Sequence, residues 1–383
     1  MARKVFAQIG SFAMKPGTQK GIHIYEYETE TADFTHLWDE SPELNAGQNG
    51  FNREKDVIYV TDESRSEGGG GVYTCRLDHV TGAVTWLGQR PTLSTLPSYV
   101  ALTKSGRFAL VPHHGTGAIV TKTVRDVDGK YAFRSESDDG TLVLIEVNTD
   151  GTLGEIRDVV WHPVERGADG KLKKVPHLHC CVQSPDGGLY FVCDKGLDRV
   201  FTYRVDEENG KLILLNSAPC PERSMPRYAL FHPTLPCVYQ NNEHSAYIHV
   251  WRYGENGALA RMQRIRLLES EEESAAYTEE GASDMRLTSD GKYLYAAIRG
   301  LNLIASYAVE ADGTLRLLQN IPCGGRNPRG VCLSPDEKFF FALNRDTNNI
   351  VRFLRRADGT LADARSETSC NMPCNMQFIT YEV

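Results

Sequence analysis

The stretch Leu303–Leu315, LIASYAVEADGTL, shows strand-like alternation, then an Asp-Gly pair, and then a return to apolar sequence. Tyr, Val and Ile suit a pleated, half-buried surface, and Asp-Gly supplies the positive φ angles that tight hairpins need. The stretch therefore predicts a β-hairpin.

Six other segments repeat this form. They are GIHIYEYETETADF from Gly21, GVYTCRLDHVTGAV from Gly71, GTLVLIEVNTDGTL from Gly140, RVFTYRVDEENGKL from Arg199, YIHVWRYGENGAL from Tyr247 and IVRFLRRADGTL from Ile350. Turn glycines at 82, 151, 210, 257, 313 and 359 are 46 to 69 residues apart. A period of this length with loop insertions indicates a repeat architecture.

A second sequence pattern precedes most of the hairpins. It consists of an apolar strand, a turn and another apolar strand. Examples start at Val100, His179, Tyr228, Asp284 and Gly330. Each unit then has four strands, and seven such units favour an all-β, seven-bladed β-propeller of four-stranded antiparallel blades over a sandwich. Helical repeats are disfavoured because the segments lack apolar residues at i, i+3, i+4 and i+7.

The two ends of the chain, MARKVFAQIG and NMQFITYEV, are strand-like and stand outside the complete units. We expect them to pair in one shared blade and close the ring, so that residues 1–383 form a single domain. Two insertions, 123–139 and 162–174, are rich in charge and glycine and are predicted to be surface loops.

Composition limits the classes of partner and the cellular location. The net charge of −8 gives no broad positive field, so a nucleic-acid role is not expected. No apolar run approaches the roughly 20 residues of a spanning helix, and the N-terminus lacks a signal-peptide core, so a cytoplasmic protein without membrane contact is expected. Most of the ten cysteines lie in apolar strand-like runs and are predicted to be reduced.

In a propeller, the start of the innermost strand and the end of the second strand open on the same face of each blade. Polar residues gather at these places. At the starts stand His177, His179, Arg227, Asp284 and Arg329, and at the ends stand Glu63, His113, His114, Asp194, Glu243, Arg299, Asn344 and Arg345. Mixed cationic and acidic groups with histidines are typical of a site for a small anionic molecule.

Simpler interpretations stand beside this one. Polar residues at a propeller mouth are often solvated loop residues or halves of structural ion pairs. His177 and His179 lie on one side of a strand and could supply two metal ligands, and Cys370 with Cys374 forms a lone CxxxC pair. Neither spacing supplies a full ligand set, so no metal and no cofactor is expected.

Four motifs carry a family resemblance over nearly the whole chain. They are His179-Cys-Cys-Val-Gln-Ser-Pro-Asp-Gly, Pro226-Arg-Tyr-Ala-Leu-Phe-His-Pro followed by Asn242-Glu243, Ser289-Asp-Gly-Lys-Tyr-Leu-Tyr-Ala-Ala-Ile-Arg, and Asn327-Pro-Arg-Gly. The chain resembles the seven-bladed β-propeller lactonases, which include a bacterial type of 6-phosphogluconolactonase and the fungal 3-carboxy-cis,cis-muconate lactonizing enzyme. The resemblance implies that the family's central-pocket residues fall on His179, Arg227, Glu243 and Arg299.

This resemblance implies a hydrolase of carbohydrate metabolism, acting without metal on a sugar or sugar-acid lactone. Glu243 and His179 are the candidates for proton transfer, while Arg227 and Arg299 would bind an anion and polarise the carbonyl. His177, Arg329, Asp194, Asp284 and Asn344 are expected to contact the substrate. A carboxymuconate-type cycloisomerase and a non-catalytic propeller that binds protein partners remain as alternatives, and the sequence does not decide the oligomeric state.

Overall fold

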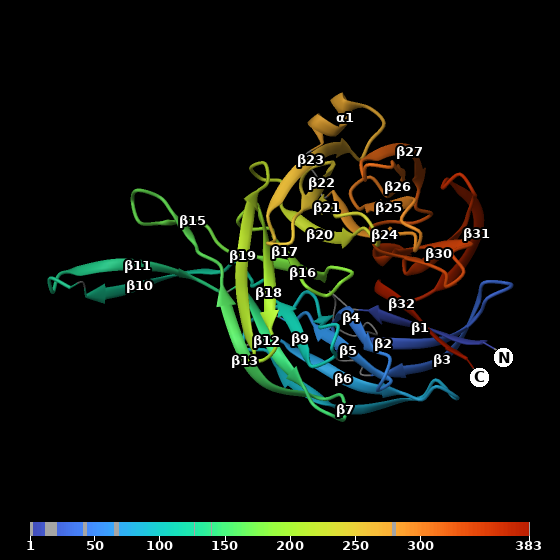
Figure 1. Ribbon diagram of the computed structural model, residues 1–383, viewed down its shortest axis with the longest axis horizontal. Coiled ribbons are helices and arrows are strands. Elements are labelled where there is room, and N and C mark those ends of the chain that lie inside the picture. Colours follow the sequence, from blue (N-terminus) through green and yellow to red (C-terminus); the bar gives the residue numbers. More distant parts are fainter. Residues whose placement is uncertain are drawn as a thin grey trace.

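The computed structural model describes residues 3–11, 21–40, 44–64, 69–125, 127–138, 140–277 and 281–382. Within them, seven four-stranded sheets stand around a ring, as Figure 1 shows. Every neighbouring pair of strands in these sheets is antiparallel. The predicted seven-bladed propeller is confirmed.

The blades are numbered here along the chain, each from its innermost strand outward. Blade 1 has β32 (Pro373–Glu382), β1 (Arg3–Ser11), β2 (Gly21–Glu28) and β3 (Asp33–Glu40); blade 2 has β4 (Ala46–Asn52), β5 (Val57–Asp62), β6 (Gly71–Leu77) and β7 (Val84–Pro91). Blade 3 has β8 (Ala101–Leu102), β9 (Phe108–Pro112), β12 (Thr141–Val147) and β13 (Leu153–Trp161); blade 4 has β16 (Leu178–Gln183), β17 (Tyr190–Asp194), β18 (Arg199–Asp206) and β19 (Lys211–Pro219).

The remaining three blades follow the same order. Blade 5 has β20 (Pro226–Phe231), β21 (Cys237–Asn242), β22 (Tyr247–Tyr253) and β23 (Leu259–Arg266). Blade 6 has β24 (Ala282–Leu287), β25 (Tyr293–Ile298), β26 (Leu303–Val309) and β27 (Leu315–Pro322). Blade 7 has β28 (Pro328–Leu333), β29 (Phe339–Asn344), β30 (Asn349–Arg355) and β31 (Leu361–Ser369).

The seven predicted hairpins are the outer two strands of the seven blades. The six turn glycines all have positive φ, between 63° and 90°, and five of them follow Asp or Asn, as the turn chemistry predicts. A side chain at Gly359 would also collide with the neighbouring blade, since its Cβ would lie 2.0 Å from the ring of Tyr293. The turns therefore serve blade packing as well as chain reversal.

Ring closure joins the two ends of the chain. Strand β1 pairs with β32 from Arg3↔Glu382 to Ile9↔Met376, and Figure 1 shows the N- and C-termini side by side. This confirms that both ends share one blade.

Side chains of each sheet alternate between the two neighbouring blades. Phe340 packs on Tyr295 of blade 6, with ring centroids 5.1 Å apart, whereas Phe341 packs on Tyr27 of blade 1 at 6.0 Å. All ten cysteines are buried and none is bonded to another, while their reduced state in solution stays a prediction.

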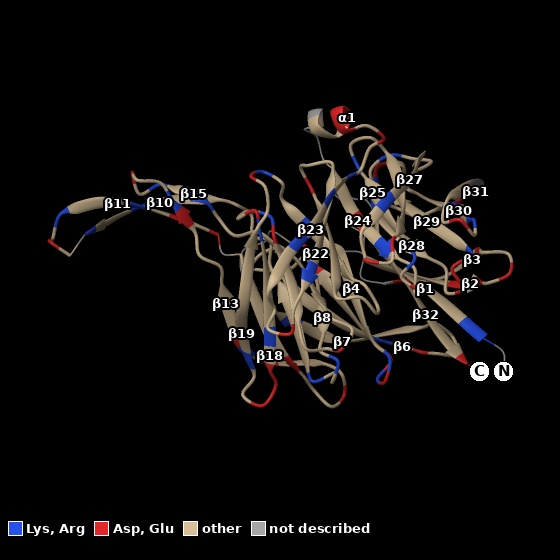
Figure 2. Cartoon of the chain, turned by 45° about the horizontal axis from the view of Figure 1, so that its top comes forward, with Lys and Arg blue, Asp and Glu red and all other residues tan. Residues whose placement is uncertain are grey.

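The two insertions are not loops throughout, which corrects that expectation. Strands β10 (Ile119–Arg125) and β11 (Tyr131–Ser137) form a two-stranded sheet, and so do β14 (Glu165–Arg166) and β15 (Leu172–Lys174). The β10–β11 hairpin projects from the ring and carries both basic and acidic residues (Figures 1 and 2). Its β-branched residues around an Asp-Gly turn form the same sequence pattern that predicts the hairpins of the blades. Asp126 and Asp139 lie outside the described residues.

Helix is scarce in the described part of the chain. It comprises α1 (Glu271–Ala276), capped by the Ser270 side chain, and the 3₁₀ turn η1 (Arg345–Thr347). No helix among the described residues is long and apolar enough to cross a membrane.

Candidate active site

A repeated irregularity of the blades builds the site. In blades 2, 4, 5, 6 and 7 the first pair between the two inner strands is followed by a register shift; these pairs are Ala46↔Asp62, Leu178↔Asp194, Pro226↔Asn242, Ala282↔Ile298 and Pro328↔Asn344. Bulges of this kind bend a strand and redirect a side chain. In each of these blades, two residues then lie at the same face of the ring. One follows the first paired residue of the innermost strand, and the other follows the last residue of the second strand.

Glu243 is the centre of the site and is contacted from three blades. Its Oε2 lies 3.0 Å from Nε of Arg227 and 2.6 Å from Nζ of Lys195, and its Oε1 lies 3.5 Å from Nη2 of Arg299. Arg227 also donates to the carbonyl of Ser283 and lies over the ring of Tyr228, 4.9 Å from its centroid. Glu243 and Arg227, which the sequence pattern places on one face of the ring, are therefore in direct contact.

The charges of this cluster fix its protonation. Burial raises the pKa of Glu243, but Lys195, Arg227 and Arg299 together outweigh burial and hold that pKa well below its usual range. Burial lowers the pKa of Lys195 to about 8, against the opposing attraction of Glu243. Glu243 is therefore a carboxylate at neutral pH, and Lys195 is a cation close to its titration point.

Three histidines flank Lys195. His114 donates from Nδ1 to the carbonyl of Gly115 at 2.8 Å, so its Nε2 accepts from Lys195 Nζ at 3.1 Å. The ring of His177 stacks on that of His114 at 4.8 Å and donates to the His114 carbonyl at 2.6 Å. Burial and the charge of Lys195 lower the pKa of His114 to about 3, so this imidazole is neutral.

His179 lies beside the cluster, with its ring 5.2 Å from that of Tyr228 and 6.1 Å from that of His114. Burial and then Arg227 and Lys195 hold the pKa of His179 well below its usual range. Its Nδ1 is buried and has no hydrogen-bond partner among the described residues. The side chain is a neutral imidazole with a nitrogen that the protein does not use.

Arg329 occupies the same position of blade 7 that Arg227 occupies of blade 5. It binds Oε2 of Glu63, from blade 2, at 2.9 Å. The Glu63 side chain passes over Gly47, where an added Cβ would lie 2.1 Å from Glu63 Oε1. Glycine at 47 is therefore needed for this ion pair to span the closing blade.

Neutral polar groups join three blades beneath these ion pairs. The Tyr228 hydroxyl donates to Oε1 of Gln48 at 3.1 Å, and Asn375 donates to the same oxygen. Asn49 in turn donates to Oδ1 of Asn375 at 2.7 Å. This network links blades 1, 2 and 5 and includes Tyr228, which contacts Arg227.

Three residues expected to contact the substrate are instead engaged by the protein. Asp194, with no exposed surface, accepts from His162 at 2.7 Å and from the backbone N–H of His177 at 2.9 Å. Asp284 binds Arg286 at 2.8 Å, and the fully buried Asn344 donates to the carbonyl of Cys323 at 3.1 Å. These contacts tie all three residues to the strands that carry the site, and their contact with a substrate stays a prediction.

Lys195 and Tyr228 are the site residues that the sequence pattern does not predict, whereas His114 is among the polar residues expected at this face. Comparison of equivalent positions in the blades could have predicted Lys195. Lys195 directly follows the last residue of β17, just as Glu243 follows β21 and Arg299 follows β25. The sequence pattern instead predicts Asp194, one residue earlier, as the site residue of this blade.

Within the described chain, one group of three potential metal ligands has donor atoms close together, and it comprises His23, His36 and Asp39 of blade 1. Neither His177 with His179 nor Cys370 with Cys374 belongs to such a group.

Known proteins resemble the chain over most of its length. A family profile described as "Lactonase, 7-bladed beta-propeller" matches residues 6–378. A 6-phosphogluconolactonase of Bacillus subtilis (strain 168) is 23% identical over 335 residues, covering 87% of this chain and 86% of the relative. Another protein of that name, from Formosa agariphila, is 23% identical over 334 residues, covering 85% and 86%.

Solved structures show the same fold. The periplasmic gluconolactonase PpgL of Pseudomonas aeruginosa superposes with a TM-score of 0.84 at 23% identity, covering 99% of each chain. At this identity the likeness concerns the fold alone.

Proposed function

The chain belongs to the family of seven-bladed β-propeller lactonases, and from that premise we propose that it hydrolyses an anionic sugar lactone, of the 6-phosphogluconolactone type, at the cluster around Glu243. The observation that carries the proposal is the surplus of buried positive charge on one face of the ring. Four cations, Lys195, Arg227, Arg299 and Arg329, surround two carboxylates, Glu243 and Glu63. The net charge of +2 suits a phosphate or carboxylate on the substrate.

Hydrolysis joins a water oxygen to the lactone carbonyl carbon and breaks the bond between that carbon and the ring oxygen. The attacking water loses a proton, and the ring oxygen gains one as it leaves as an alcohol. The product acid then ionises at neutral pH and releases a proton to solution.

We assign the first proton transfer to His179 rather than to Glu243. A neutral imidazole with an unused nitrogen can accept a proton, whereas both oxygens of the Glu243 carboxylate are already engaged by three cations. Glu243 then keeps Lys195, Arg227 and Arg299 in place. Arg227 and Arg299 stabilise the developing oxyanion, and Lys195, with a pKa of about 8, protonates the leaving oxygen.

The alternatives differ from this proposal in their substrates. A cycloisomerase would use similar groups to add a carboxylate across an alkene, but neither relative reported above carries such a name. A protein-binding propeller would favour an apolar mouth, and the charged cluster argues against it.

We also propose that the chain forms one domain and acts in a reducing compartment such as the cytoplasm. The single ring closed by β1 and β32 supports the first statement, and ten free thiols support the second.

A lactone panel tests the proposed function. Purified protein is assayed by acid titration at constant pH on 6-phosphogluconolactone, gluconolactone and a carboxylated muconolactone, after subtraction of spontaneous hydrolysis. We expect the highest kcat/KM on the phosphorylated lactone, with the same rate in EDTA. Activity on the muconolactone alone would support the aromatic-breakdown alternative, and inactivity on every lactone would contradict the proposal.

A further inference from the structure

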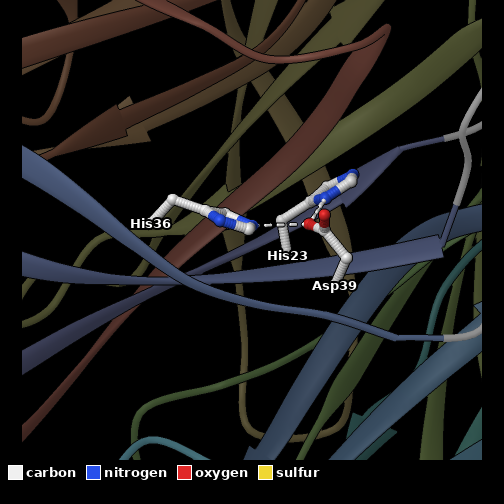
Figure 3. A group of neighbouring side chains, drawn as sticks. All are labelled: His23, His36 and Asp39. Carbon is white, nitrogen blue, oxygen red and sulfur yellow. Dashed lines mark hydrogen bonds and ion pairs between the residues drawn. The ribbon is translucent and has the colours of Figure 1, made fainter.

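A second group of polar side chains lies on the outer strands of the closing blade. His23 is on β2, and His36 and Asp39 are on β3 (Figure 3). His23 and Asp39 are partners in the antiparallel register, which places their side chains on one face of the sheet.

One carboxylate oxygen lies between the two imidazoles. Oδ1 of Asp39 is 2.6 Å from Nδ1 of His23 and 2.7 Å from Nε2 of His36. The three donor atoms all lie within 4.8 Å of one another. Two imidazole nitrogens and one carboxylate oxygen are the ligands that borderline divalent transition metals prefer.

We propose that His23, His36 and Asp39 bind a divalent transition-metal ion, with Zn²⁺ as the best fit and water as the fourth ligand. Zinc binds nitrogen at about 2.0–2.1 Å, so a tetrahedral site needs donor atoms about 3.3 Å apart. The nitrogens would have to separate from Asp39 by roughly 0.6 Å. The Asp39 side chain, 39% exposed, has room to make that change.

Ser11 prepares His23 for this role. The Ser11 hydroxyl lies 3.0 Å from Nε2 of His23, and both groups are buried. When Nδ1 of His23 donates to Asp39, Ser11 can donate to Nε2. When a cation occupies Nδ1, the ring proton moves to Nε2 and Ser11 accepts it, so the hydroxyl satisfies both tautomers.

The proposed metal site is separate from the cluster around Glu243. Its residues lie on the two outer strands of blade 1, whereas Glu243, Lys195, Arg227 and Arg299 come from blades 4, 5 and 6. A bound ion would cross-link β2 and β3 within the blade that closes the ring. We therefore expect it to stabilise the fold rather than to take part in lactone chemistry.

Zinc titration of the full-length protein tests this inference. Protein freed of metal with EDTA and desalted is titrated with ZnCl₂ by calorimetry, with MgCl₂ as the comparison cation. We expect one equivalent of Zn²⁺ to bind, a higher unfolding temperature with zinc, and no such response to Mg²⁺. Binding of less than about a fifth of an equivalent would overturn the proposal.

Variants separate this site from adventitious binding. His36→Ala and Asp39→Asn change exposed side chains and should weaken zinc binding at least about tenfold. His79→Ala, which removes an exposed histidine outside the group, is the matched control and should bind zinc as the unaltered chain does. Equal zinc affinity in His36→Ala and His79→Ala would place the ion elsewhere and reject the site.

Discussion

Lys195 of blade 4 and Glu243 of blade 5 form an ion pair of 2.6 Å, with side chains only 10% and 13% exposed. The pair lies between the ends of β17 and β21, so it links two blades at the centre of the charged cluster. Because burial lowers the pKa of Lys195 to about 8, the charge of this pair changes close to physiological pH. We therefore expect the site to be sensitive to alkaline conditions.

The pH profile of kcat/KM should show that sensitivity. Lys195 is charged below its pKa, so activity should fall as the pH rises through about 8, where the ammonium is lost. Lys195→Arg should lower kcat but remove this fall, because the guanidinium stays charged. Lys211→Arg, in a surface pair with Asp158 at 3.0 Å, should keep the original profile. An unchanged alkaline fall in Lys195→Arg would assign the titration to another group.

Arg299→Ala should weaken both substrate binding and rate. The guanidinium lies 3.5 Å from Glu243, and an anionic substrate would lose a charge-assisted partner. We expect kcat/KM to fall about 10- to 100-fold, with a higher KM, in steady-state assays. Arg316→Ala, which breaks an exposed pair with Glu310, is the control. A KM equal to that of the control would show that Arg299 does not bind the substrate.

Sequence predicted the repeated parts of the fold well because each hairpin carries its own turn chemistry. Gly313 follows Asp312, and its φ of 89° is a local property that the Asp-Gly dipeptide predicts. The charge and glycine content of the β10–β11 segment predict a loop instead of a hairpin, although its turn has the same dipeptide, Asp128-Gly129.

The site was only partly predictable. Glu243 and Arg227 belong to adjacent strands of one blade, so topology alone brings them together. The pair between Glu63 and Arg329 joins residues 266 positions apart, and it depends on how the ring closes. The protonation state of Glu243 also required the structure, because two of the three cations around it, Lys195 and Arg299, come from other blades.

Truncation tests ring closure. Deletion of residues 376–383 removes most of the pairing of β1 with β32 and two buried side chains, Met376 and Ile379. Loss of two such side chains alone should lower the free energy of unfolding by at least about 4 kcal/mol, as measured with denaturant. Replacing residues 120–134 of the projecting β10–β11 hairpin, whose described residues are mostly exposed, by a short glycine-serine linker is the control. Full stability after the terminal deletion would contradict closure through β32.

Alkylation tests the cysteines. All ten are buried free thiols, so iodoacetamide should leave the folded protein nearly unmodified and add ten groups after unfolding without reductant. Mass spectrometry counts the added groups. Several thiols that react only after reduction would reveal disulfides and would argue against a reducing compartment.

The most direct test of the central claim is the kcat/KM of Glu243→Gln on 6-phosphogluconolactone. The variant keeps the shape of the side chain but leaves Lys195, Arg227 and Arg299 without their shared counter-charge. Glu310→Gln, which alters an exposed glutamate paired with Arg316, is the matched control, and circular dichroism verifies that both variants are folded. We predict a loss of about 10²- to 10⁴-fold in Glu243→Gln and none in Glu310→Gln. A folded Glu243→Gln protein that hydrolyses the lactone at the rate of the unaltered chain would contradict the assignment of this cluster as the active site.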